Sequence, residues 1–314
     1  MSQAPRTVSL HSRPSLVDRA SLGRALPLLP GFGEFLEALP DIYGGRDLRL
    51  LARRWGEAVR GGHRVGVAFG AHVVKVGVQA HLLDLLERGA LHFLATHGAG
   101  AIHDLELALA GRTSEDVAAS LEAGRFGMAG ETVEVWERAL TRVREDGLGL
   151  GEALGREVLE GGFPHADLSL LARAQAAGRP LAILVAVGTD TVHVHPGIDG
   201  EALGAGSLRD FRRLCDFVAG LQDGLWVNLG SAVLLPEAFL KGVALARNAG
   251  LDLDRMTTAV LDMIRHYRPM QNVVLRPPGE GLHLTGQHEF LVPLLHQAVL
   301  HALGPAEEEG DARS

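Results

Sequence analysis

Short apolar runs alternate with longer amphipathic patterns along most of the chain. The apolar runs are too short for buried helices, and several end in glycine or a polar cluster. Such runs are typical of strands buried on both faces of a parallel sheet. The segments predicted as strands are 63–69, 90–96, 181–187, 225–229, 258–264 and 273–275.

Between these strands, apolar residues recur at helical spacing. Helices are predicted at 46–64, 78–88, 101–110, 208–221, 236–248 and 289–303. Three more, at 132–144, 151–159 and 167–177, form a helical insertion before the strand at 181–187. Thr113 to Asp116 carries cap-like residues and predicts the start of another helix, which Gly124 ends. Alternation of this kind predicts an α/β fold with a doubly wound, mainly parallel, Rossmann-like sheet.

No convincing linker or internal repeat divides the chain. We expect an N-terminal arm and amphipathic helix over 1–60, a single α/β domain over 61–303, and a disordered acidic tail over 304–314. The first 25 residues are polar and nearly without periodicity, so we expect an arm that orders only when it packs against something else.

Composition narrows the class of protein. The hydrophobic content is 46%, and no run approaches the roughly 18 apolar residues of a membrane span. The first residues lack the apolar core of a signal peptide, so we expect a cytoplasmic protein without membrane contact. The formal charge of −8 argues against a nucleic-acid partner. The single cysteine, Cys215, excludes a disulfide framework and a multi-cysteine metal site.

One strand-to-helix junction is rich in glycine. Gly98 and Gly100 follow the strand at 90–96, and Asp104 lies in the first turns of the next helix. Glycines at a helix start let a phosphate approach free backbone N–H groups. A purely structural tight turn explains the same residues, so both interpretations stay open here.

The junction residues and the order of elements resemble those of deoxyhypusine synthases, over about residues 66–303. That family has a Thr-Ser-Asn turn, a Thr-Ala-Gly-Gly turn and a Thr-Asp-Gly turn around NAD and a polyamine. Similar segments here are Gly70-Ala71-His72, Thr96-His97-Gly98-Ala99-Gly100 with Asp104, Thr189-Asp190, and a late glycine turn at Gly230-Ser231-Ala232. The resemblance implies NAD binding by Ala71, His72, Thr96, Gly98, Ala99, Gly100, Asp104, Gly230 and Ser231. It also implies a homo-oligomer, a tetramer in that family.

The chain differs from this family in the segment that carries the family's catalytic lysine. The carrier lysine of the family ends a Ser-Trp-Gly-Lys segment, but residues 268–277 hold no lysine, tryptophan or glutamate. The chain has only two lysines, Lys75 and Lys241, and both lie elsewhere. An acidic, glycine-containing segment that helps to hold NAD is replaced by Asp262 to Tyr267. We therefore expect a protein that does not make deoxyhypusine by the family route.

Histidines and carboxylates collect near the predicted strand ends. The candidate catalytic residues are His97, Asp190, His193 and His195. Imidazole and carboxylate groups act as acid and base near neutral pH, or bind zinc. If the strand continues, His193 and His195 share one face; a hydrogen-bonded loop is the plainer explanation. Arg265, Arg268 and Arg276 are candidates for binding a carboxylate or phosphate, or are simply exposed.

Three functions follow from these patterns. The leading hypothesis is an enzyme of altered deoxyhypusine-synthase-like chemistry, a transferase or oxidoreductase that binds NAD or a related nucleotide at the Gly98 turn. Its substrate, a small amine or polar metabolite, would contact Asp190, His193 and His195. The second hypothesis is a hydrolase or lyase that depends on a divalent metal such as zinc. The third is a non-catalytic oligomeric ligand-binding protein that keeps the fold.

Overall fold

The computed structural model describes residues 6–19, 31–179 and 181–304. Its centre is a sheet of six parallel strands in the order β5-β3-β2-β6-β7-β8. The strands are β2 (Val65–Phe69), β3 (Phe93–His97), β5 (Ala182–Leu184), β6 (Leu225–Leu229), β7 (Thr257–Asp262) and β8 (Glu280–Thr285). Counted along the sheet, this is the 3-2-1-4-5-6 order of a Rossmann fold. The predicted α/β class with a doubly wound parallel sheet is confirmed.

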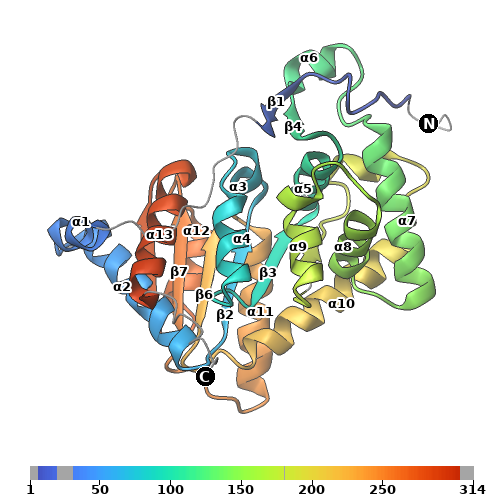
Figure 1. Ribbon diagram of the computed structural model, residues 1–314. Coiled ribbons are helices and arrows are strands. Elements are labelled where there is room, and N and C mark those ends of the chain that lie inside the picture. The colour runs from blue at the N-terminus through green and yellow to red at the C-terminus, as the bar shows by residue number, and fades with distance from the viewer. Residues whose placement is uncertain (1–5, 20–30, 180, 305–314) are drawn as a thin grey trace, which may run out of the picture.

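Helices cover both faces of the sheet (Figure 1). One face carries α2 (Tyr43–Arg60), α4 (Gln79–Glu87), α5 (Gly98–Ala110), α9 (Leu170–Ala176) and α13 (His288–Leu303). The other carries α10 (Gly200–Val218) and α11 (Leu234–Asn248). Side chains alternate across each strand, so Val65 and Val67 pack with the first set and Ala68 with the second. The sheet is therefore buried on both faces, as its apolar strands predict.

Helix α2 belongs to the main core although it precedes the first strand of the large sheet. Its Leu51 and Trp55 are buried in the same cluster as Val67. The indole N–H of Trp55 donates to the Ala90 carbonyl at 2.7 Å. The amphipathic pattern of 46–64 thus marks a helix that packs its apolar side on the sheet.

The remaining elements surround this core. They are α1 (Phe32–Ala38), α3 (Ala71–Lys75), α6 (Val117–Glu122), α7 (Gly130–Asp146), α8 (Leu150–Glu160) and α12 (Tyr267–Pro269), with short helical segments at Ala166–Leu168, Thr191–Val194 and Met270–Leu275. Helices α7, α8 and α9 form the predicted insertion. Among the described residues, no helix is long and apolar enough to cross a membrane.

The N-terminal arm is ordered by contacts with the middle of the chain. Strand β1 (Ser15–Asp18) pairs with β4 (Arg112–Glu115) in a two-stranded antiparallel sheet. The Leu10 N–H donates to Glu131 Oε2 at 2.8 Å. Figure 1 shows β1, β4 and α6 above the ends of the large sheet. The arm therefore lies over the edge where the sequence analysis places the site.

Two sequence predictions are corrected. Residues 273–275 are helical rather than a strand, and β8 lies just after them. Apolar Val273 packs under the sheet as part of a helical turn, where Thr258 Oγ1 donates to its carbonyl at 2.6 Å. Residues 112–115 form β4, and only Asp116 caps the helix that follows, accepting from the Ala119 N–H at 3.2 Å. Of the predicted tail at 304–314, only Gly304 belongs to the described residues. Residues 1–5 and 20–30 of the predicted arm also lie outside them.

Candidate functional site

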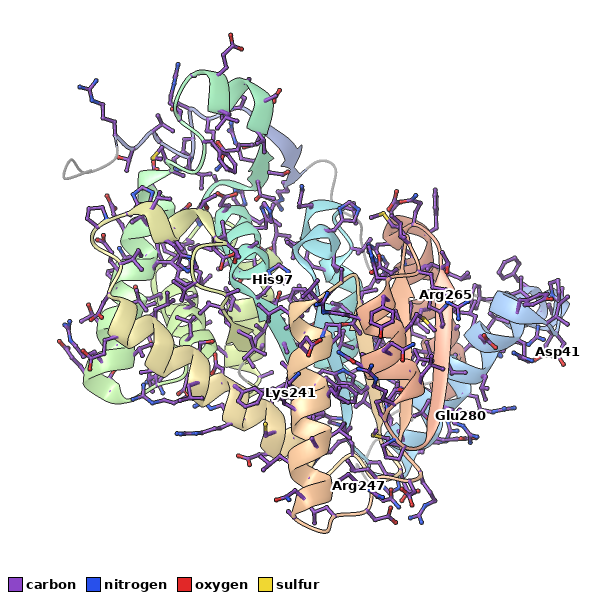
Figure 2. All side chains as sticks on the ribbon, turned by 180° about the vertical axis from the view of Figure 1, so that it is seen from behind. Asp41, His97, Lys241, Arg247, Arg265 and Glu280 are labelled. Carbon is purple, nitrogen blue, oxygen red and sulfur yellow. The ribbon has the colours of Figure 1, made fainter. Side chains whose placement is uncertain are left out.

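The strands of the large sheet all end at one edge, and the strand order reverses there between β2 and β6. After β2 the chain passes through α3 and α4 to β3 on one side; after β6 it passes through α11 to β7 on the other. Figure 2 shows His97 and Arg265 near this edge and Glu280 near the opposite one. In open α/β sheets, ligands bind in the crevice at such a reversal.

The backbones at the ends of β2 and β6 touch through two glycines. A Cβ atom on Gly70 would lie 2.0 Å from the Gly230 carbonyl oxygen. Gly230 has φ of +67°, a conformation that side chains disfavour. The Gly70 N–H donates to the Leu229 carbonyl, which extends the strand ladder to this point. Because neither residue has a side chain, the two turns lie in direct backbone contact at the switch point.

Polar atoms are buried beneath these glycines without partners. Asn228 is fully buried in β6, and its Oδ1 accepts no hydrogen bond from any described residue. Its Nδ2 donates to the Ser231 carbonyl at 2.9 Å. Asp262, at the end of β7, is also buried, and its Oδ2 has no partner among the described residues. Unpaired buried oxygens are costly, so they mark a place where a ligand or water supplies donors.

Two histidines flank the same crevice. The rings of His72 on α3 and His288 on α13 lie 5.5 Å apart, and a Cβ on Gly230 would meet the His288 ring. Burial lowers the pKa of both histidines. Both rings are therefore neutral at pH 7, and each presents one donor and one acceptor nitrogen.

A cavity of about 220 Å³ lies beside the ends of β3 and β5. Its walls come from α3, the start of α5, β4, and the loop after β5. The residues that matter below are Arg13, Lys75, Glu106, Glu115 and Asp190, with Ala99 and Phe126 as apolar wall. The N-terminal arm supplies Arg13, so the arm completes this cavity.

Asp190 and His193 form a pair at the wall of the cavity. The Gly188 and Asp190 N–H groups approach His193 Nδ1 at 3.1 and 3.3 Å, which makes Nδ1 the acceptor. The ring proton therefore sits on Nε2, which lies 3.9 Å from Asp190 Oδ2. Burial raises the pKa of Asp190, and the nearby His193 and the Ala99 N–H oppose this rise. Asp190 Oδ2 accepts no hydrogen bond from a described residue.

Three charged side chains of the cavity, from the arm, α5 and β4, pair with one another. Arg13 lies 2.8 Å from Glu106 and 3.4 Å from Glu115, and all three side chains are nearly fully buried. Glu115 Oε1 also accepts from the Gly127 N–H at 2.9 Å. The second oxygen of Glu115, Oε2, has no partner among the described residues. One free carboxylate oxygen therefore remains on this wall.

The predicted glycine turn serves internal packing. A Cβ on Gly98 would lie 2.0 Å from Asp190 Oδ2, and one on Gly100 would lie 2.1 Å from Thr96 Oγ1. Thr96 donates from that oxygen to the Phe69 carbonyl at 2.9 Å. The start of α5 is thus already next to a carboxylate of this protein. Of the two interpretations left open by the sequence, the structural turn accounts for these contacts.

Asp104 and His195 are held by hydrogen bonds within the protein. Asp104 is buried and accepts from the Ser169 hydroxyl and from the Leu170 and Leu171 N–H groups at 2.5, 2.7 and 3.1 Å. It therefore caps the start of α9. His195 Nε2 lies 3.0 Å from the Gly127 carbonyl oxygen. Residues 191–194 form a short helix rather than a continued strand, so the shared face proposed for His193 and His195 does not exist.

The other candidates are divided between the edge and the surface. His97 ends β3, and burial lowers its pKa, with His103 as a second cause. Arg265 is exposed, while Arg268 and Arg276 contact Glu237 and Asn272. Within the described part of the chain, no group of three or more histidine, cysteine or acidic residues is arranged to hold a metal ion. The zinc hypothesis gains no support from these residues.

Sequence reasoning missed several residues of the edge. Lys75, Glu115, Asn228 and Asp262 are absent from its candidate list. Asn228 carried a usable signal, because a polar side chain inside the apolar run 225–229 needs a partner. No sequence pattern indicates that Arg13 lines the cavity, because its position depends on how the N-terminal arm packs against the rest of the chain.

The fold is shared with several solved structures. AgrE in ternary complex with ornithine and NAD⁺ is 15% identical, with a TM-score of 0.54 over 81% of this chain. A putative LOR/SDH protein from Methanococcus maripaludis S2 is 12% identical, with a TM-score of 0.53 over 83% of this chain and 71% of that one. The chain spans 33% of the length of AgrE. At such identities the likeness shows the fold alone.

A putative deoxyhypusine synthase from Entamoeba histolytica is also similar, at 9% identity and a TM-score of 0.49 over 86% of this chain and 93% of that one. A score this low carries no argument, so deoxyhypusine synthase is one weak likeness among several. No family model and no curated protein matches the sequence. The comparisons thus show a shared fold and leave the function to the site itself.

Proposed function

We propose that this chain is an enzyme that binds NAD or a related dinucleotide between the ends of β2 and β6 and acts on a small amine or polar metabolite. The observation that carries this proposal is the reversal of strand order between β2 and β6, where the turns of Gly70 and Gly230 meet. In open α/β sheets, ligands bind at the carboxyl ends of the strands at such a reversal. AgrE, of similar fold, has been solved with ornithine and NAD⁺.

The residues present fit a dinucleotide in part. The unpaired oxygens of Asn228 and Asp262 lie near the glycine contact, where ligand hydroxyls or amides supply donors. The G-x-G-x-x-G fingerprint is absent, because only Gly70 stands in the segment Gly70 to Lys75. Recognition of a pyrophosphate would therefore rest on the backbone of both turns and on His72 rather than on a glycine-rich loop.

We assign the nucleotide and the substrate to two different places at this edge of the sheet. The crevice of Gly70, Gly230 and His72 takes the nucleotide, and the cavity of Asp190 takes the substrate. A bound nicotinamide supplies hydride transfer chemistry. Asp190, whose pKa is raised by burial, holds or releases a proton, and His193 Nε2–H stabilises its charged form. Neutral His97 lies at the same edge as a second proton acceptor.

The chemistry is proposed to differ from that of deoxyhypusine synthase. Lys241 is exposed and paired with Glu237, four residues away on α11. Lys75 lies on α3 and lines the cavity, far in sequence from the position of the family's lysine. No lysine therefore stands in residues 268–277 to carry a butylamine group.

Calorimetric titration with NAD⁺ tests the proposal. We expect saturable binding and a rise in unfolding free energy of about 2.7 kcal/mol at a hundred times the dissociation constant. Gly70→Ala should abolish binding, because its methyl group would collide with the Gly230 backbone. Gly204→Ala is the matched control, since a Cβ there meets nothing within 4 Å.

Absence of NAD⁺ and NADP⁺ binding by the folded wild-type protein would refute the proposal. So would equal binding by folded Gly70→Ala. His72→Ala provides a second check that does not crowd the backbone, and it should weaken binding while the protein stays folded. Binding without turnover on any amine or polar metabolite would favour the non-catalytic hypothesis.

A further inference from the structure

The cavity beside Asp190 presents free groups of both charges. Asp190 and Glu115 are each 7% exposed, and each has one carboxylate oxygen without a partner among the described residues. The same cavity is lined by Lys75, whose ammonium group makes no hydrogen bond or ion pair with a described residue. Arg13 is already committed to Glu106 and Glu115. Among the charged side chains of the cavity, two carboxylates are therefore left for a cation and one ammonium group for an anion.

The size of the cavity excludes a large ligand. At about 220 Å³ it is smaller than the roughly 300–1,000 Å³ of pockets that hold drug-sized molecules. A dinucleotide does not fit in this space, which leaves the cavity free for a small molecule when the crevice is filled.

The free groups are also arranged by depth. Asp190 and Glu115 are buried, whereas Lys75 is half-buried at the wall formed by α3. A ligand ammonium group would satisfy the buried oxygens, which otherwise stay unpaired at a cost. A ligand carboxylate would pair with Lys75 nearer the opening.

We propose that this cavity binds a small amino acid, with its ammonium group held by the carboxylates of Asp190 and Glu115 and its carboxylate by Lys75. The inference rests on the proposed function and names its substrate class. A simple amine would leave Lys75 without a partner. A simple carboxylic acid would leave both buried oxygens unpaired and would meet their repulsion. Only a ligand with both groups satisfies the whole wall.

The test is calorimetric titration of the wild-type protein with the twenty standard L-amino acids and L-ornithine, with and without NAD⁺. At least one amino acid should bind. Its decarboxylated amine and its deaminated acid, titrated in parallel, should each bind about tenfold or more weakly. No binding by any amino acid, or equal binding by the amine, would overturn the inference.

The two lysines of the chain provide a matched pair of variants. Lys75→Met should weaken amino-acid binding about tenfold or more, and Lys75→Arg should weaken it less. Lys241→Met, which removes the exposed lysine on α11 seen in Figure 2, should leave binding unchanged. Asp190→Asn should weaken binding about thirtyfold or more. Equal loss in both lysine variants, or none in either, would contradict the placement.

NAD⁺ affinity, measured on the same samples, separates this inference from the proposed function. If NAD⁺ binds but no amino acid does, the inference fails and the nucleotide site stands. If neither binds, both fail. If an amino acid binds through Lys75 but NAD⁺ and NADP⁺ do not bind, the cavity is assigned correctly and the nucleotide proposal is refuted.

Discussion

The substitution Asp104→Asn separates a structural from a cofactor-binding role for this carboxylate. Asp104 caps α9 through Ser169, Leu170 and Leu171, and burial raises its pKa to about 6. Its ordinary value is 3.8. The difference of about two pKa units corresponds to about 3 kcal/mol. Because the folded state holds the proton more tightly, this stability is complete below pH 3.8 and is lost as the pH rises through 6.

About 1.4 kcal/mol of that loss falls between pH 5 and pH 8. The change in unfolding free energy over this range, measured by urea denaturation, should therefore differ by about 1.4 kcal/mol between the wild-type protein and Asp104→Asn. Asp116→Asn, at the capping position of α6, is the matched control for the substitution. NAD⁺ affinity should be the same in wild type and Asp104→Asn. An unchanged pH dependence together with lost NAD⁺ binding would refute the structural role and restore Asp104 to the cofactor site.

Further predictions concern the site, the arm, metal and assembly. His97→Ala and Asp190→Asn should each lower turnover or ligand binding without a change in circular dichroism. Normal activity in both variants would contradict the assigned location of the site. Arg13→Met should lower the unfolding free energy by about 3–5 kcal/mol, measured with urea, because Glu106 and Glu115 stay buried without their partner. Prolonged chelation should leave ligand binding intact; its loss would revive the metal hypothesis. Light scattering after size exclusion should show the proposed homo-oligomer, and a monomer at all concentrations would contradict it.

The sheet was predictable because its strands carry a continuous apolar signal. Residues 63–69 and 225–229 each contain a parallel strand of the structure, and residues 90–96 contain all but the last residue of one. Strand β8 was missed because Glu280 to Thr285 mixes polar and apolar residues, as an edge strand with one exposed side does. Residues 273–275 are equally apolar but helical, because a short apolar run does not by itself distinguish the two.

The candidate site was predictable only as far as chain order decides it. Asp190, His72 and Gly230 follow strands, so the parallel topology alone brings them to one edge. The contact between Gly70 and Gly230 depends on β2 and β6 being neighbours, which no local pattern encodes. Likewise, the closing of the cavity by Arg13 depends on pairing between β1 and β4, about a hundred residues apart in sequence.

Hydrogen–deuterium exchange with and without saturating NAD⁺ tests the central claim most directly, because it reports both binding and its location. The account predicts slower exchange in the turns after β2 and β6, over residues 70–76 and 230–236, on both sides of the Gly70–Gly230 contact. Protection that is absent, or confined to segments away from this edge of the sheet, would contradict a dinucleotide site at the switch point.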